Sequence, residues 1–171
     1  MLSSSYNILA AATGADGLVP NWVSSQGAGV NGPGNDANGQ YYGYDACRTP
    51  FRIALDYCEN GEPRAKAYLD KIVTFLDTAG GTRLAGLKDG YTTTGTNPPG
   101  SLGDYSAGMA FFGPAGVGAL AGGHEAVLSG VYTSLVINTS SASSGSFTYF
   151  HGSWGVLSLM AMSGNYWDMT Q

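Results

Sequence analysis

Residues 41–57 read Tyr41-Tyr42-Gly43-Tyr44-Asp45-Ala46-Cys47-Arg48-Thr49-Pro50-Phe51-Arg52-Ile53-Ala54-Leu55-Asp56-Tyr57 and lead from a glycine-rich loop into an amphipathic helix. From Cys47 to Cys58 the apolar residues recur at helical spacing, while the charged residues form a separate stripe. Pro50 has no N–H and disfavours helical geometry at the residue before it, so we expect the helix to begin near Pro50. Asp45 then lies on a loop and points outward.

Asp45 stands among aromatic and basic residues in a pattern typical of carbohydrate sites. Tyr41, Tyr42 and Tyr44 offer flat surfaces for sugar rings, and Arg48 lies three residues beyond the acid. A nearby cation favours the ionised form of an acid, so we expect Asp45 to be a carboxylate that can accept a proton. The alternative is that Asp45 is only a helix cap, whose oxygen accepts N–H groups of the first turn.

The composition indicates one globular domain with an uncharged polar surface. The chain has 171 residues, of which 43% are hydrophobic and only 11% are charged, with 27 glycines and 11 tyrosines. Such a surface makes neutral hydrogen bonds and stacking contacts, which is common in secreted proteins that handle polysaccharides. The net charge of −5 argues against a nucleic-acid partner, because little neutralises phosphates.

Cysteine, histidine and apolar patterns exclude several other classes. On one continuous helix Cys47 and Cys58 would lie about 16 Å apart along the axis, too far for a disulfide, so we expect both to be free and buried in one stripe. Two histidines and two distant cysteines predict no metal site, and nothing in the pattern indicates another cofactor. Residues 1–6 lack the basic start and apolar run of a signal peptide, and residues 105–123 contain too many glycines for a convincing membrane span.

The rest of the chain reads as helices separated by long loops, with no strand alternation. We expect helices over residues 5–13, about 50–60, 63–78, 105–121 (interrupted at Pro114), 125–138 and 149–162, with a serine-rich link over 139–146. Residues 60–63 form a tight turn, with Pro63 as the first residue of the next helix. The fold class is therefore all-α, built of helical hairpins.

Several segments in register resemble glycoside hydrolase family 8, the inverting (α/α)6-barrel enzymes that include bacterial endo-β-1,4-glucanases. The segments are Gly17-Leu18-Val19-Pro20-Asn21-Trp22, Tyr44-Asp45-Ala46-Cys47-Arg48-Thr49-Pro50-Phe51-Arg52, Arg64-Ala65-Lys66-Ala67, Asp89-Gly90-Tyr91-Thr92, Phe112-Gly113-Pro114 and Ser163-Gly164-Asn165-Tyr166. The family tends to have Asp in place of Asn21. The resemblance covers the C-terminal part of the family and implies about half of an (α/α)6 barrel, as one domain over residues 1–171, with the N-terminal portion absent.

The resemblance implies roles for single residues. Asp45 corresponds to the family's general base, which activates water, and Arg48 and Tyr44 would orient it as further catalytic residues. Substrate-binding candidates are Tyr42, Tyr149, Trp22 and Tyr91. The implied substrate is a β-1,4-linked glucan or related polysaccharide, and the implied location is extracellular, with neither nucleic acid nor membrane as a partner.

The family's general acid is a Glu in a Ser-Glu-Gly-like motif, and no such motif occurs in this sequence. Its only glutamates are Glu59, Glu62 and Glu125, and none fits the setting of the acid. We therefore expect this chain to supply the base half of a hydrolase site, with the acid coming from missing sequence or another chain. Two alternatives stay open: a non-catalytic glycan-binding module, and an assembly piece that self-associates to cover its core. Cellulose, xylan, chitosan and mixed-linkage glucan all remain candidate substrates.

Overall fold

The computed structural model describes residues 2–140 and 149–166. It contains the helices α1 (Leu2–Ala12), α2 (Thr49–Asn60), α3 (Pro63–Gly80), α4 (Met109–Gly122), α5 (Glu125–Ser140) and α6 (Tyr149–Met162). Short 3-10 turns span Pro33–Asn35, Ala37–Gln40, Ala46–Arg48 and Thr82–Leu84. Within these described ranges, extended segments form only isolated β-bridges with each other, and no β-strand is present. The all-α prediction is confirmed.

The helices α2 and α3 form the predicted hairpin. Gly61 ends α2 in the left-handed conformation, with φ 63°, and its N–H donates to the Tyr57 carbonyl at 2.8 Å. Pro63 then begins α3, where its missing N–H costs nothing, and the Glu62 carboxylate accepts the N–H of Arg64 at 3.0 Å. The turn residues therefore favour this reversal of the chain locally.

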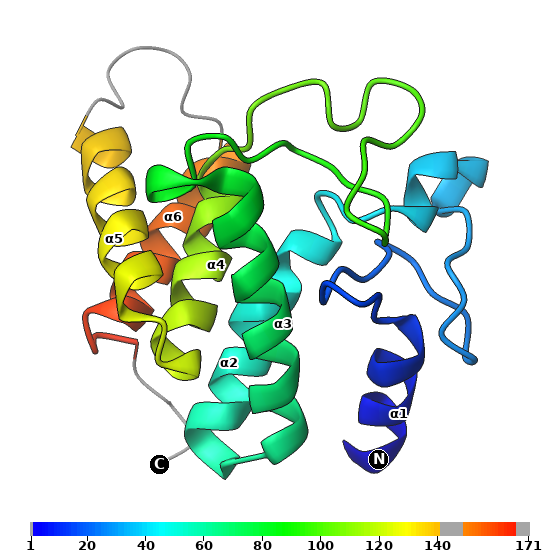
Figure 1. The fold of residues 1–171 in the computed structure, drawn as a ribbon, viewed down its shortest axis with the longest axis horizontal. Coiled ribbons are helices and arrows are strands. Elements are labelled where there is room, and N and C mark those ends of the chain that lie inside the picture. Colours follow the sequence, from blue (N-terminus) through cyan, green and yellow to red (C-terminus); the bar gives the residue numbers. More distant parts are fainter. Residues whose placement is uncertain (1, 141–148, 167–171) are drawn as a thin grey trace.

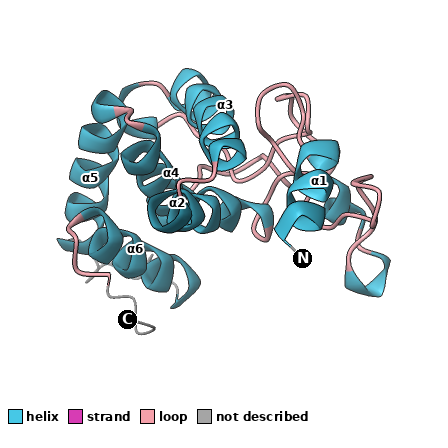
Figure 2. Ribbon diagram, turned by 90° about the horizontal axis from the view of Figure 1, so that it is seen from below, coloured by secondary structure: helices cyan, strands magenta, loops and turns pink. Residues whose placement is uncertain are grey.

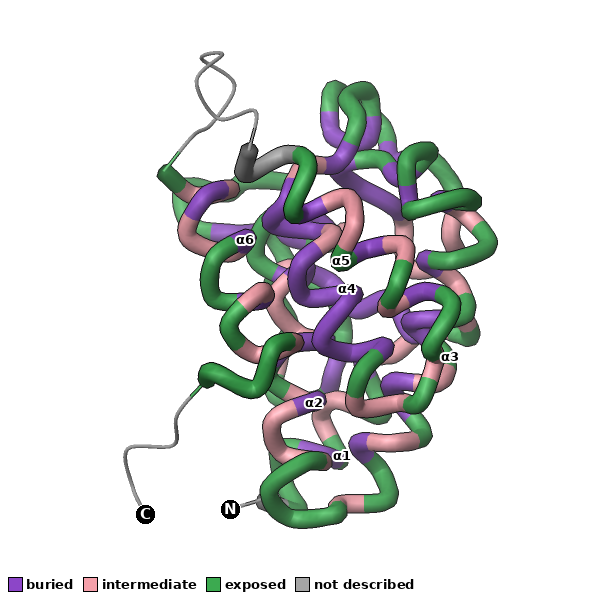
Figure 3. Tube along the Cα trace, turned by 90° about the vertical axis from the view of Figure 1, so that its left-hand side faces the viewer, coloured by how far each residue is buried: buried purple, intermediate pink, exposed green. Residues whose placement is uncertain are grey.

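Helix α4 is the centre of the core and contacts α2, α3, α5 and α6. Figure 3 shows its trace buried along most of its length. The predicted start at Tyr105 is wrong, because the Ala107 N–H donates to the Leu87 carbonyl at 2.8 Å and keeps this segment paired with the preceding loop. The predicted interruption at Pro114 is also wrong, since α4 runs unbroken through it. A proline removes one helical hydrogen bond, and packing against the four neighbouring helices stabilises the rest.

The helices follow one another around an arc. Figure 2 shows α3, α2 with α4, α5 and α6 in succession, while α1 lies on the other side of α2, apart from α5 and α6. Figure 1 shows the long loops between α1 and α2 and between α3 and α4 at one end of this arc. The arrangement is a partial α/α toroid whose two long loops lie near the start of α2, which is where Asp45 lies.

Both cysteines are free, but only Cys47 is buried, in the 3-10 turn before α2, whereas Cys58 is exposed. The prediction of a single buried stripe is wrong, because the buried residues of α2 end at Ala54 and Cys58 lies in the exposed last turn of the helix. The last helix, predicted from Tyr149 to Met162, is confirmed, and residues 141–146 of the serine-rich link lie outside the described residues. Within the described part of the chain, every helix is too short or too polar to cross a membrane.

Candidate active site

Asp45 lies in an open hollow of 360 Å³ at the start of α2, lined by residues of the first long loop and the first turns of the helix. Its Oδ1 accepts a hydrogen bond from Arg48 Nη2, and its Oδ2 accepts one from Trp22 Nε1 at 3.0 Å. The side chain is 47% exposed. Each carboxylate oxygen has more than one acceptor direction, so both can also accept a proton or a water hydrogen from the hollow.

The carboxylate of Asp45 makes no capping hydrogen bond to the turn that follows it. Asn21 caps this turn instead, because its Oδ1 accepts the N–H groups of Asp45 and Ala46 at 3.0 and 2.9 Å. The Nδ2 of Asn21 donates to the Asn38 carbonyl at 3.0 Å and so fixes the amide in place. The capping interpretation of Asp45 is therefore wrong. Because the Asn21 side chain accepts the backbone N–H groups of the turn, the Asp45 carboxylate is free of that role and lines the hollow.

The glycine before this turn makes room for the arrangement. A Cβ on Gly43 would lie 2.9 Å from Asn21 Nδ2 and 3.3 Å from Leu102 Cδ1. Contacts this short would push away the amide that holds the Asp45 backbone. The Asn21 segment is in turn held by its own backbone, because the Asn21 N–H donates to the Tyr41 carbonyl at 2.8 Å.

Tyr44 is 39% exposed and lies with its ring against Phe111 and His151, at centroid distances of 5.2 and 6.1 Å. Its hydroxyl donates to Oδ2 of the buried Asp89 at 3.2 Å. Burial and the neighbouring Asp89 raise the pKa of Tyr44 to about 12. Tyr44 is therefore a neutral, fixed phenol across the whole physiological pH range, and it bonds to Asp89 and does not line the Asp45 hollow.

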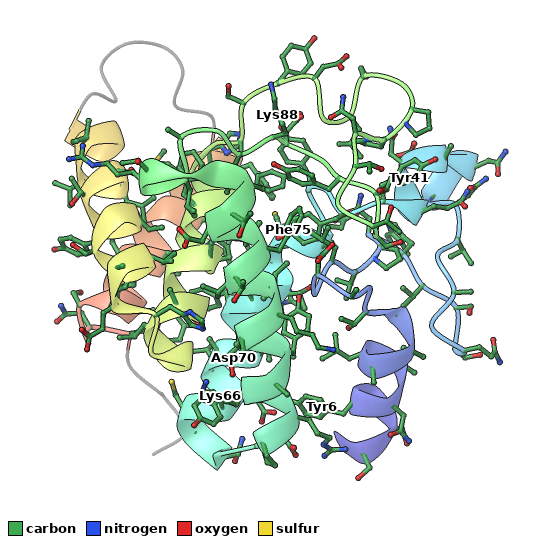
Figure 4. All side chains as sticks on the ribbon, in the orientation of Figure 1. Tyr6, Tyr41, Lys66, Asp70, Phe75 and Lys88 are labelled. Atoms are coloured by element: carbon green, nitrogen blue, oxygen red, sulfur yellow. The ribbon has the colours of Figure 1, made fainter. Side chains whose placement is uncertain are left out.

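Two of the predicted sugar-contacting tyrosines are in the core. Tyr42 is 1% exposed and packs edge-on against Phe111, and Tyr91 is 7% exposed and packs against Phe75. Their backbones pair with each other, with N–H to carbonyl distances of 2.9 and 3.0 Å. Figure 4 shows Phe75 on α3, close to these loops. The expectation that the two rings offer surfaces to sugars is corrected: they join the first long loop to the loop before α4.

The other two predicted binding residues reach the surface in different settings. Trp22 is 45% exposed and lines the Asp45 hollow, whereas Tyr149 is 90% exposed at the start of α6 and is not among the residues that line it. Tyr105, which sequence reasoning did not single out, is 68% exposed on the loop before α4. The structure thus joins Trp22, Asp45 and Arg48 in one hollow and leaves Tyr149 outside it.

Asn21 and Asp89 are the residues that sequence reasoning did not assign. Both lie in segments that resemble the family, and Asn21 stands where the family tends to have Asp. Position in a shared segment was a usable signal, but the partners of both residues lie more than ten residues away, so spacing alone could not show what they hold.

None of the glutamates lines the hollow. The Glu62 carboxylate pairs with Arg64, and the hydrogen bonds from Arg64 lower the pKa of Glu62 to about 2. A general acid needs the opposite, a raised pKa that keeps it protonated. Glu59 and Glu125 are exposed on helix surfaces. Within the described residues, no group of three histidine, cysteine or acidic side chains is placed to bind a metal.

Comparison with known proteins places this fold among polysaccharide hydrolases. The chain is 32% identical over 156 residues to a beta-glucanase of Niallia circulans and 31% identical over 150 residues to endoglucanase C of Ruminiclostridium cellulolyticum. Each match covers 88% of this chain, but only 36% of the beta-glucanase and 29% of endoglucanase C. The chain therefore spans about a third of the length of these curated relatives. No family profile matches it.

The solved structures agree with this comparison. A beta-1,3-1,4-glucanase from Paenibacillus sp. X4 superposes on 95% of the chain with a TM-score of 0.77 and 28% identity, over 43% of its own length. A GH8 enzyme from Teredinibacter turnerae, solved with xylobiose, superposes on 96% of the chain with a TM-score of 0.75, over 39% of its own length. At 19% identity this second likeness shows the fold alone.

The fold is a partial α/α toroid, the fold of the glycoside hydrolases on which the chain superposes. Within that class, the resemblance of the chain to glycoside hydrolase family 8 is confirmed, over most of this chain and over less than half of each family member.

Proposed function

We propose that this chain supplies the general-base half of an inverting site that hydrolyses β-1,4-linked glucan. The observation that carries the proposal is the setting of the Asp45 carboxylate. Asn21, and not Asp45, caps the turn before α2. Trp22 and Arg48 donate hydrogen bonds to the Asp45 carboxylate and hold it at an open hollow. The names of the relatives, beta-glucanase and endoglucanase, support a glucan as substrate.

In the proposed reaction a water molecule lies between Asp45 and the anomeric carbon of a bound sugar. As the water oxygen bonds to that carbon, its proton passes to Asp45, and the glycosidic C–O bond breaks on the opposite face. Arg48 and Trp22 donate to separate oxygens of Asp45 and hold its plane, which fixes where the water can lie. The leaving oxygen takes a proton from a general acid that the described residues do not supply.

The source of that acid is part of the proposal. Inversion needs two carboxyl groups about 6.5 to 9.5 Å apart, and Asp45 occupies only one of the two positions. We place the acid in barrel sequence that this chain does not span, or in a second chain that covers the open side of the arc. An extracellular location, as in the family, is proposed with it.

A second candidate is an assembly or binding piece without turnover. Apolar side chains of α5 and α6 are exposed, namely Tyr132, Val136, Ile137, Val156, Leu157 and Met160. Exposed apolar groups in such number favour contact with another protein surface. Glycan binding without hydrolysis would support a binding module, and a defined oligomer indifferent to glycans would support an assembly piece.

The proposed function is tested by reducing-sugar release from soluble β-glucans, with the mass of the chain followed by light scattering. We expect hydrolysis when the missing barrel sequence or second chain that carries the general acid is also present. In Asp45→Asn we expect hydrolysis to be lost and glycan binding to be retained. Hydrolysis at an equal rate in Asp45→Asn would remove Asp45 from its role.

A further inference from the structure

Asp89 is a buried carboxylate that the proposed reaction does not use. It is 4% exposed and lies in the loop between α3 and α4. A carboxylate this deeply buried is rare unless its oxygens are satisfied. Its partners therefore indicate why the chain keeps it.

The two oxygens of Asp89 bind different parts of the chain. Oδ1 accepts the N–H groups of Gly103 and Tyr105, at 2.9 and 3.2 Å, and so anchors the loop that presents the exposed Tyr105 ring. Oδ2 accepts the hydroxyl proton of Tyr44 at 3.2 Å. The same loop is closed by the Asp89 N–H, which donates to the Tyr105 carbonyl at 3.1 Å. One side chain thus ties the turn next to Asp45 to the loop before α4.

The direction of the Tyr44 hydrogen bond determines what Tyr44 offers to a ligand. A phenol has one proton to donate and also accepts through its oxygen. Because a carboxylate can only accept, the Tyr44 proton is committed to Asp89. The part of the oxygen that faces away from Asp89 can then only accept a hydrogen bond.

We propose that Asp89 is a positioning residue that makes Tyr44 a hydrogen-bond acceptor for a sugar hydroxyl in the subsite next to Asp45. This inference rests on the proposed function, since it names a recognition element of the same site. Tyr44 is 39% exposed and directly precedes Asp45 in the chain, but it is not among the residues that line the Asp45 hollow. The proposed contact is therefore to a sugar bound at the edge of the hollow.

Asp89→Asn tests the proposal with almost no change of shape. The amide oxygen can still accept from Gly103 and Tyr105, while the amide nitrogen replaces Oδ2 and donates to the Tyr44 oxygen. Tyr44 then turns its own proton outward and becomes a donor. Tyr44→Phe removes the hydroxyl, and Asp104→Asn, at an exposed position of the same loop, is the matched control.

The measurement is calorimetric binding of cellohexaose to the full chain, combined with thermal unfolding of each variant. We expect Asp89→Asn to weaken binding by about tenfold, the effect of one misdirected hydrogen bond, and to cause no further loss when Tyr44 is already Phe. Asp104→Asn should bind as the unmodified chain does. A loss of equal size in both backgrounds would mean that Asp89 only holds the loop, and this would overturn the proposal while leaving the proposed function intact. An unchanged affinity in Asp89→Asn would do the same.

Absence of cellohexaose binding by the unmodified chain would overturn the proposed function and, with it, this inference.

A second measurement needs no change at Asp89. The difference in phenolate absorbance between the unmodified chain and Tyr44→Phe reports the ionisation of Tyr44 alone. We expect Tyr44 to ionise well above pH 10, the ordinary value, because burial and the Asp89 contact both raise its pKa. Half-ionisation near pH 10 would contradict the buried, Asp89-bonded setting of Tyr44 and overturn the proposal.

Discussion

Asp45 is held by donors from two segments of the chain. Arg48 lies three residues on, and Trp22 lies 23 residues back in the first long loop. One donor is charged and the other is neutral, and each takes a different oxygen. Two fixed donors restrict rotation of the carboxylate plane, which is the restriction that a base needs when it must meet a water in one position.

Trp22→Phe should separate the orienting role of Trp22 from its aromatic surface. The change removes the Nε1–H bond to Asp45 and keeps a ring at the wall of the hollow. With the part of the barrel that carries the general acid present, we expect kcat on β-glucan to fall by about tenfold, as for a lost hydrogen bond to a charged acceptor at a partly exposed site, with KM nearly unchanged. Val23→Ala, on the same loop, is the control. A raised KM at full kcat would instead make Trp22 a sugar platform only.

The contact between Asp45 and Arg48 could be predicted because both residues lie within one turn. The bond from Trp22 and the support from Asn21 could not, since they depend on how a long loop without regular strands or α-helices folds back on α2. The burial of Tyr42 and Tyr91 was missed for a related reason. A tyrosine in a loop gives no periodic signal that distinguishes core from surface.

At the scale of elements, the close approach of α4 and α6 depends on small residues. A Cβ on Gly113 of α4 would lie 2.8 Å from Ser158 Cβ and 3.0 Å from the Trp154 carbonyl oxygen, both on α6. Since one of these atoms belongs to the backbone, the helices would have to move apart. The small side chains of α4 thus let helices on several sides reach it.

Gly113→Ala should therefore lower the free energy of unfolding by about 1 to 3 kcal/mol, the usual cost of overpacking. Ser158→Ala is the matched control: its hydroxyl is buried and has no hydrogen-bond partner among the described residues, so its removal should stabilise by up to about 1 kcal/mol. Both values are measured by urea unfolding. Equal stability of Gly113→Ala and the unmodified chain would contradict the tight α4–α6 contact.

Helix α3 carries an acid whose charge contributes to stability. Asp70 accepts hydrogen bonds from Lys66 at 2.6 and 2.7 Å and lies 3.1 Å from Nε2 of His124, and Figure 4 shows Lys66 and Asp70 together on α3. Burial raises the pKa of Asp70, but the hydrogen bonds from Lys66 and His124 outweigh it and lower the pKa below its ordinary value. The folded state therefore favours the ionised acid.

A lowered pKa means that this stabilisation is present above the unfolded value, near pH 4, and is lost as the pH falls through the folded value. Asp70→Asn should lower the melting temperature at pH 7, and the difference from the unmodified chain should shrink below about pH 4. Asp77→Asn, exposed on the same helix, serves as the control in thermal scans at both pH values. A difference that grew at low pH would contradict the assignment.

Helices with strong turn signals at their ends were predictable and helices without them were not. The α2–α3 turn and the bounds of α6 followed from local residues. The start of α4 did not, because residues 105–107 are helix-compatible in sequence but pair with the loop that contains Leu87 and Lys88. Tertiary pairing overrides local preference at such a boundary.

At the scale of the whole molecule, the partial toroid was predicted from the ordered resemblance to family 8 and not from helix periodicity. Periodicity indicates hairpins, but it does not say how many hairpins close a ring. The chain matches about a third of the length of its curated relatives, and the Asp45 hollow lies at the loop end of the arc. The proposed function accordingly gives this chain one of the two carboxyl groups that inversion requires.

The proposed role of Asp45 as the base can be isolated with a substrate that needs no general acid. In 2,4-dinitrophenyl β-cellobioside the leaving group departs without being protonated, so the contribution of the base can be measured alone. The measurement is dinitrophenolate release by the chain and by Asp45→Asn, with the configuration of the released cellobiose followed by NMR. We predict α-cellobiose as the first product and a loss of at least about a hundredfold in Asp45→Asn. Equal rates for the two chains, or β-cellobiose as the first product, would contradict this role.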